Sequence, residues 1–156
     1  MHRPRNRLPR WQRITLYTAA CVLTVTGLAW LALHYTVGAG AGELPHPGES
    51  WLMQLHGAAG FAALFGFGIA AAVHVPRGWR LVHPAQPPGA ALEAGLRSHR
   101  RTGIALVALA ALLVLSAHAL YYAAPEWLRP ALGWVHAALG LAMLGIGFIH
   151  KRHVVH

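Results

Sequence analysis

Four apolar stretches dominate this sequence, and each is about as long as a membrane-spanning helix. They cover about residues 14–37, 51–74, 102–122 and 131–150. A helix needs roughly 20 apolar residues to cross about 30 Å of hydrocarbon. Of all residues, 56% are hydrophobic and only 11% are charged, which is unusual for a water-soluble domain. We therefore expect an all-α integral membrane protein with a single transmembrane domain, residues 1–156, that crosses the membrane several times.

Basic residues gather on one side of the predicted spans. Several arginines precede the first stretch, and others lie in the 75–101 connection. Lys151 and Arg152 follow the fourth stretch, and Arg129 alone lies on the other side. In a bacterial inner membrane, the positive-inside rule then predicts cytoplasmic N and C termini. Short connections favour an up-down-up-down four-helix bundle. Because the basic residues flank the spans, they indicate membrane lipid and no nucleic acid as the surroundings.

Turn formers and prolines predict where the helices end. The 38–50 segment is rich in glycine and proline, and the Val75-Pro76 and Arg129-Pro130 steps disfavour helical backbone before each proline. Tryptophans lie near the ends of the spans, where amphipathic rings prefer the headgroup layer. We expect helix boundaries at both prolines.

Two histidines occur in each of the second and fourth apolar stretches. His56 and His74 are 18 residues apart, and His136 and His150 are 14 residues apart. At 3.6 residues per turn these separations are close to whole turns, so each pair lies on one face of its helix. Ionisable residues inside hydrocarbon are costly and indicate function.

Paired imidazoles on facing helices are the usual axial ligands of a b-type haem in a helical bundle. Antiparallel helices would bring His56 to His136 at the outer face and His74 to His150 at the inner face. The single cysteine, Cys21, leaves no CxxCH motif for covalent attachment. The sequence therefore predicts two haem b groups, held by the iron ligands His56, His136, His74 and His150.

Glycines accompany the predicted ligands. Gly60 follows His56 by four residues, and Gly140 follows His136 by four residues, so each shares the face of its histidine. Small residues let a flat porphyrin approach the backbone, although they also serve helix packing in lipid. We include Gly60 and Gly140 in the predicted cofactor site.

Three further histidines are alternative ligands. Eighteen residues rise roughly 27 Å along a helix and fourteen rise roughly 21 Å, so the inner ends of the two pairs do not match in depth. His99, near the inner start of the third stretch, is therefore an alternative to His74. His34 and His118, near the outer ends of their stretches, are alternative ligands or hydrogen-bonding groups.

Several segments together resemble the bacterial membrane di-haem cytochromes b. The segments are Leu55 to Gly60 (LHGAAG), the end of the second stretch at His74, Leu120-Tyr121-Tyr122, and His136 to His150 with its spacing of fourteen. The chain is similar to the cytochrome b561 type and to the cytochrome b subunits of nickel-iron hydrogenase and formate dehydrogenase. The resemblance implies a four-helix bundle with two bis-histidine haems that passes electrons between a quinone pool and a protein partner.

We thus interpret the chain as an electron-transfer protein or a subunit of an oxidoreductase complex rather than as a self-contained enzyme. A quinone and a redox partner protein or periplasmic cytochrome are its expected partners. One alternative is a quinol-oxidising subunit in which His34 or His118 binds the quinone and Glu43 or Glu49 takes protons. The other is a membrane transporter that binds Zn²⁺ or Cu²⁺ through an outer cluster of His34, His56, His118 and His136.

Overall fold

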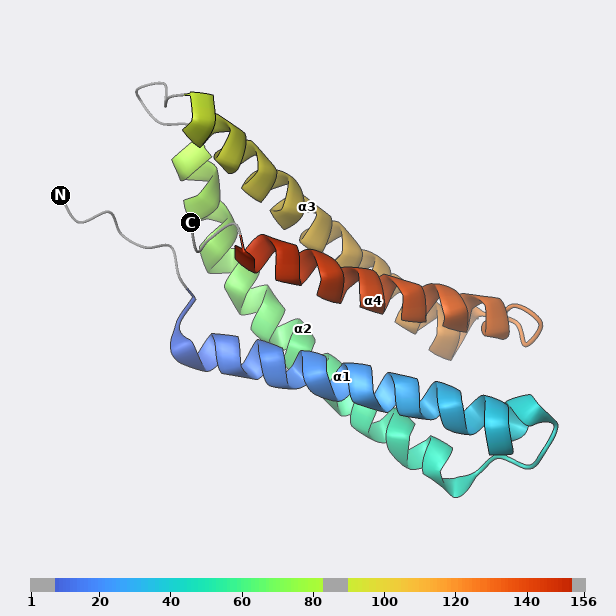
Figure 1. The fold of residues 1–156 in the computed structure, drawn as a ribbon. Helices are drawn as coiled ribbons and strands as arrows, with labels where there is room; N and C mark the ends of the chain where they lie inside the picture. The colour runs from blue at the N-terminus through green and yellow to red at the C-terminus, as the bar shows by residue number, and fades with distance from the viewer. Residues whose placement is uncertain (1–7, 83–89, 153–156) are drawn as a thin grey trace. The chain divides into compact units, whose positions relative to one another are not determined.

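The computed structural model describes residues 8–82 and 90–152, and the elements in these ranges are helices (Figure 1). A 3₁₀ turn, η1, follows the first long helix, and a π-helical turn, η2, follows the third. In chain order the elements are α1 (Arg10–Val37), η1 (Ala39–Ala41), α2 (Pro47–Val82), α3 (Ala90–His118), η2 (Ala119–Ala123) and α4 (Arg129–Arg152).

Four helical segments are long and apolar enough to cross a membrane: Arg10–Ala41, Pro47–Val73, Arg100–Ala123 and Arg129–Lys151. In the most apolar window of each segment, at most 11% of the residues are buried within the protein. Large side chains such as Phe61, Phe65 and Leu115 are 79%, 70% and 65% exposed. Apolar surface on this scale is unfavourable in water, and a helix satisfies its own backbone hydrogen bonds in lipid. The expected all-α class with four membrane-spanning helices is confirmed at this level.

The helix ends differ from the expectation at one of the two prolines. Pro76 lies inside α2, which continues to Val82, so the predicted boundary at Val75-Pro76 was wrong. Proline removes one backbone N–H donor from a helix but does not always end it. Pro130 is the second residue of α4, where its missing N–H costs nothing because the first turn has no intrahelical acceptor for it. The boundary predicted there is confirmed.

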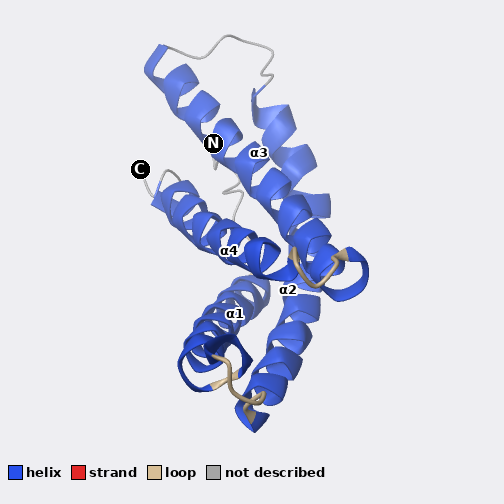
Figure 2. Ribbon diagram, turned by 90° about the vertical axis from the view of Figure 1, so that its right-hand side faces the viewer, coloured by secondary structure: helices blue, strands red, loops and turns tan. Residues whose placement is uncertain are grey.

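The chain forms two compact units, Met1–Arg77 and Gly78–His156. In the first unit, α1 and α2 form an antiparallel hairpin through η1, and in the second unit α3 and α4 form another through η2 (Figures 1 and 2). Helices that are neighbours in sequence therefore run antiparallel within each hairpin, as short connections require.

Candidate functional site

Three of the four predicted ligand histidines place Nδ1 against a hydroxyl of the other helix in their hairpin. In the first unit, Thr26 Oγ1 on α1 lies 3.0 Å from His56 Nδ1 on α2. In the second unit, Ser116 Oγ on α3 lies 2.8 Å from His136 Nδ1 on α4. Thr102 Oγ1, near the other end of the α3 segment, lies 2.8 Å from His150 Nδ1. Each ring is thus fixed by a hydrogen bond between two helices.

The hydroxyls of Thr26 and Ser116 also determine the histidine tautomer. Thr26 Oγ1 lies 2.6 Å from the carbonyl oxygen of Val22, and Ser116 Oγ lies 3.0 Å from that of Leu113. A carbonyl can only accept, so each hydroxyl donates its one proton to the backbone. The imidazole must then donate from Nδ1 to the hydroxyl oxygen. This tautomer has its lone pair on Nε2, the atom through which a histidine with an Nδ1–H partner binds a metal.

The two hairpins present these groups at matching positions. The pattern of exposed and half-buried residues over 51–60 of α2 recurs position for position over 131–140 of α4, with His56 and His136 at the same place. Thr26 and Ser116 are both buried, at 6% and 7% exposure. The Thr26–His56 pair of the first unit and the Ser116–His136 pair of the second unit therefore have the same construction.

Small residues lie beside two of the rings. A Cβ atom at Gly27, the residue after Thr26, would be 3.2 Å from His56 Cε1. A Cβ at Gly103, the residue after Thr102, would be 3.7 Å from His150 Cε1. The contact at Gly27 is tighter than most Cβ contacts, so glycine there gives the His56 ring room, whereas the contact at Gly103 is an ordinary one.

The two predicted porphyrin-edge glycines border open space. A Cβ atom added at Gly60 or Gly140 would meet no atom within 4 Å. Both lie one turn from a histidine of the matched pairs, His56 and His136. A flat ligand on these faces could therefore approach the backbone of α2 and α4.

The end of the first unit where α1 and α2 are joined holds a different arrangement. His34 Nδ1 on α1 lies 2.8 Å from Glu49 Oε2 in the first turns of α2. The indole of Trp30 stacks on the His34 ring, with centroids 4.4 Å apart and planes 14° from parallel. The structure therefore brings together two residues of the quinol-oxidising alternative, His34 as a quinone-binding group and Glu49 as a proton acceptor.

Of the other histidines named as ligands or alternatives, His118 has a described side chain. His118 ends α3 with an exposed side chain, and its ring centroid is 4.8 Å from that of Tyr122 in η2. The side chains of His74 and His99 lie outside the described residues. Their roles, and the joining of His56 to His136 across the two units, remain predictions.

Within residues 8–82 and 90–152, no group of three histidine, cysteine, aspartate or glutamate side chains is arranged to hold a metal ion.

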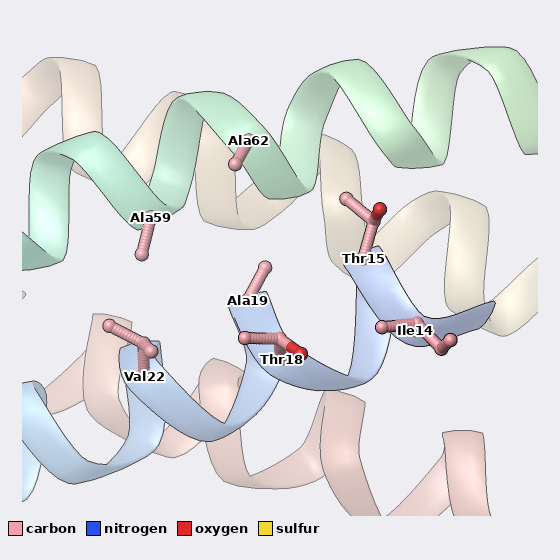
Figure 3. A pocket seen from close by; sticks show the side chains of 7 residues that line it. All are labelled: Ile14, Thr15, Thr18, Ala19, Val22, Ala59 and Ala62. Carbon is pink, nitrogen blue, oxygen red and sulfur yellow. The ribbon is translucent and has the colours of Figure 1, made fainter. Parts of the chain in front are cut away.

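A shallow hollow of about 370 Å³ lies between α1 and α2 (Figure 3). No histidine lines it. Its lining consists of Ile14, Thr15, Thr18, Ala19, Val22, Ala59 and Ala62. His56 therefore lies elsewhere on the first unit.

Sequence reasoning missed the hydroxyl partners Thr26, Thr102 and Ser116. A signal for them does exist, since a hydroxyl residue followed by a small residue recurs in the apolar stretches as Thr26-Gly27, Thr102-Gly103 and Ser116-Ala117. The sequence alone does not show which such step faces a histidine.

Comparison of the chain with protein-family models, curated proteins and solved structures finds no match in any of the three.

Proposed function

We propose that this chain is a b-type cytochrome that carries electrons across a membrane through two bis-histidine haems. The observation that carries the proposal is the shared construction around His56, His136 and His150, whose Nδ1 atoms each lie within 3.0 Å of a hydroxyl. Axial histidines of metal sites commonly donate the proton of their second ring nitrogen in this way. The proposal agrees with the function implied by the resemblance of the sequence to membrane cytochromes b.

The donor set fits a b-type haem. A bis-histidine haem needs neutral imidazoles with the lone pair on the ligating nitrogen, and the contacts of Thr26 and Ser116 favour this state in His56 and His136. When bound, the haem supplies a one-electron redox centre. The hydroxyls hold the rings in orientation, and the open space at Gly60 and Gly140 leaves room for a porphyrin edge.

The two sites belong to opposite halves of the membrane in this proposal. His56 and His136 bind the outer haem, and His150 binds the inner haem with His74, or with His99 as the alternative. His136 and His150 are fourteen residues apart on α4, a rise of about 21 Å. Haems held at these two positions would divide the path of an electron across the membrane into shorter steps.

The proposal also includes a topology, an orientation in the membrane and redox partners. We infer an up-down-up-down bundle with both termini cytoplasmic in a bacterial inner membrane, since the basic residues flank one end of the spans. Electrons would pass between a quinone pool and a protein partner, such as a periplasmic cytochrome. The zinc or copper transporter has no support from a three-residue metal group among the described residues.

A pyridine haemochrome with an iron count on the purified full-length protein tests the proposal. We expect a b-type spectrum and two haems per chain. His56→Ala and His136→Ala should each remove one haem, while His46→Ala, a substitution in the loop before α2, should retain both. A preparation that folds but lacks b-type absorbance would overturn the proposal, and zinc or copper without iron would favour the transporter.

A further inference from the structure

His34 and Glu49 form a histidine–carboxylate pair at the outer end of the first unit. His34 Nδ1 and Glu49 Oε2 are 2.8 Å apart. The Glu49 side chain is only 10% exposed, whereas that of His34 keeps 21% of its surface exposed. The carboxylate is thus shielded, while part of the imidazole stays accessible from outside the protein.

The backbone holds the carboxylate in place. Glu49 Oε1 accepts the N–H of Ala39 at 3.3 Å and the N–H of His46 at 3.1 Å. These two bonds tie the 3₁₀ turn and the start of α2 to one oxygen. A Cβ atom at position 38 would overlap Glu49 Oε1, so the carboxylate keeps this position only with glycine there. The loop is built around this side chain.

These contacts determine which nitrogen of His34 can take a proton. Oε1 accepts two N–H donors, so it carries no proton, and Oε2 faces Nδ1. The carboxylate therefore accepts the Nδ1 proton and places the lone pair of the ring on Nε2. This is the arrangement of a general base: a carboxylate orients the imidazole and stabilises the imidazolium that forms.

The surroundings of His34 suit a membrane-soluble proton donor. His34 belongs to the Arg10–Ala41 segment, which is apolar enough to span a membrane. Trp30 stacks on one face of the ring, and Tyr35 meets it edge to face with centroids 4.9 Å apart. Among lipid-soluble reductants, a quinol carries an acidic hydroxyl proton on an aromatic ring.

We propose that His34 accepts the hydroxyl protons of a quinol at the outer end of α1, with Glu49 as the positioning residue. This inference rests on the proposed function, because the electrons need the ferric b haems as acceptors. In each of two rounds, an O–H bond breaks, the proton moves to His34 Nε2 and one electron leaves. The imidazolium releases its proton outside before the second round. The product is the quinone, with two protons and two electrons removed.

The test uses full-length protein in lipid nanodiscs with decylubiquinol as the reductant. Stopped-flow absorbance follows haem reduction in the wild type, in His34→Gly and in the control Thr36→Gly. Thr36 is an exposed residue at the same end of α1, and its hydroxyl donates to the Ala32 carbonyl. We expect His34→Gly to slow reduction by about 100-fold, the usual effect of removing a general base. Dithionite should still reduce all its haem, and added imidazole should restore most of the rate.

A second measurement does not depend on haem. Decylubiquinone should bind saturably to the wild type and to Glu49→Gln, as followed by quenching of tryptophan fluorescence. A lack of saturable binding would overturn the inference. So would an unchanged reduction rate in His34→Gly, loss of haem from it, or equal slowing in the control Thr36→Gly. Absence of b-type absorbance in the wild type would instead defeat the proposed function, so the two failures are distinguishable.

Discussion

The Thr26 hydroxyl accepts a hydrogen bond from His56 and donates one to the backbone of α1. The Thr26 oxygen lies 3.0 Å from His56 Nδ1 and 2.6 Å from the Val22 carbonyl, so it accepts from the ring and donates to the backbone of its own helix. The ring is thereby tied to α1 as well as to α2, and its lone pair is placed on Nε2. The same construction recurs between Ser116 and His136.

Replacing Thr26 by valine should raise the reduction potential of the outer haem. An Nδ1–H hydrogen bond makes the imidazole a stronger donor to iron and favours the oxidised state. We expect a rise of tens of millivolts, where about 59 mV is a tenfold change for one electron. Potentiometric titration measures it. Thr26→Ser should keep the wild-type potential, and so should Thr24→Val, whose hydroxyl only donates to the Ala20 carbonyl. Equal potentials in Thr26→Val and wild type would contradict the role of the hydroxyl.

Bulky residues at the open glycines should block haem binding. Gly140→Leu places a side chain one turn from His136, on the face predicted for the porphyrin, and should lower haem content by about one per chain. Gly145→Leu is the matched control, because Gly145 also borders open space but is about 180° around α4 from His136. The haemochrome assay reports both. Full haem content in Gly140→Leu would show that this face contacts only lipid or protein.

The inner ligand opposite His150 can be identified by haem count. If His74 ligates the inner haem, His74→Ala should leave one haem per chain and His99→Ala should leave two. The single haem that remains in His74→Ala should be the one bound through His56 and His136. The reverse result, with loss only in His99→Ala, would assign His99.

The loop between α1 and α2 should be sensitive to a methyl group at position 38. Gly38→Ala forces the Glu49 carboxylate away from the N–H groups of Ala39 and His46. Losing these buried hydrogen bonds should cost about 1–3 kcal/mol of unfolding free energy. Thermal unfolding in detergent should show a lower midpoint. Gly57→Ala, whose Cβ meets no atom within 4 Å, should leave the midpoint unchanged or raise it. A midpoint for Gly38→Ala equal to that of the wild type would mean that the loop adjusts freely.

Gln12→Leu should stabilise the protein. Gln12 is only 4% exposed, and its Oε1 has no hydrogen-bond partner among the described residues. A buried polar atom without a partner costs about 1–3 kcal/mol, which an apolar side chain of similar size avoids. The unfolding midpoint should therefore rise. Gln54→Leu on the exposed face of α2 is the control and should change it little. A lower midpoint in Gln12→Leu would indicate that the amide is hydrogen-bonded in the membrane.

The sequence by itself determined the four spans and the faces of the histidines. Span length follows from the thickness of hydrocarbon, and a face follows from the 3.6-residue period, so both are local properties of one segment. Local rules failed at Pro76, because a single lost N–H bond did not stop α2.

Only the tertiary structure decided which side chains meet. Thr26 and His56 are 30 residues apart, Thr102 and His150 are 48 apart, and His34 meets Glu49 across a loop. Such pairs depend on the rotation and register of two helices about their axes, which no single segment encodes. Apolar length and helical period thus place each histidine at a depth and on a face, while helix packing selects the hydroxyl or carboxylate that fixes its proton.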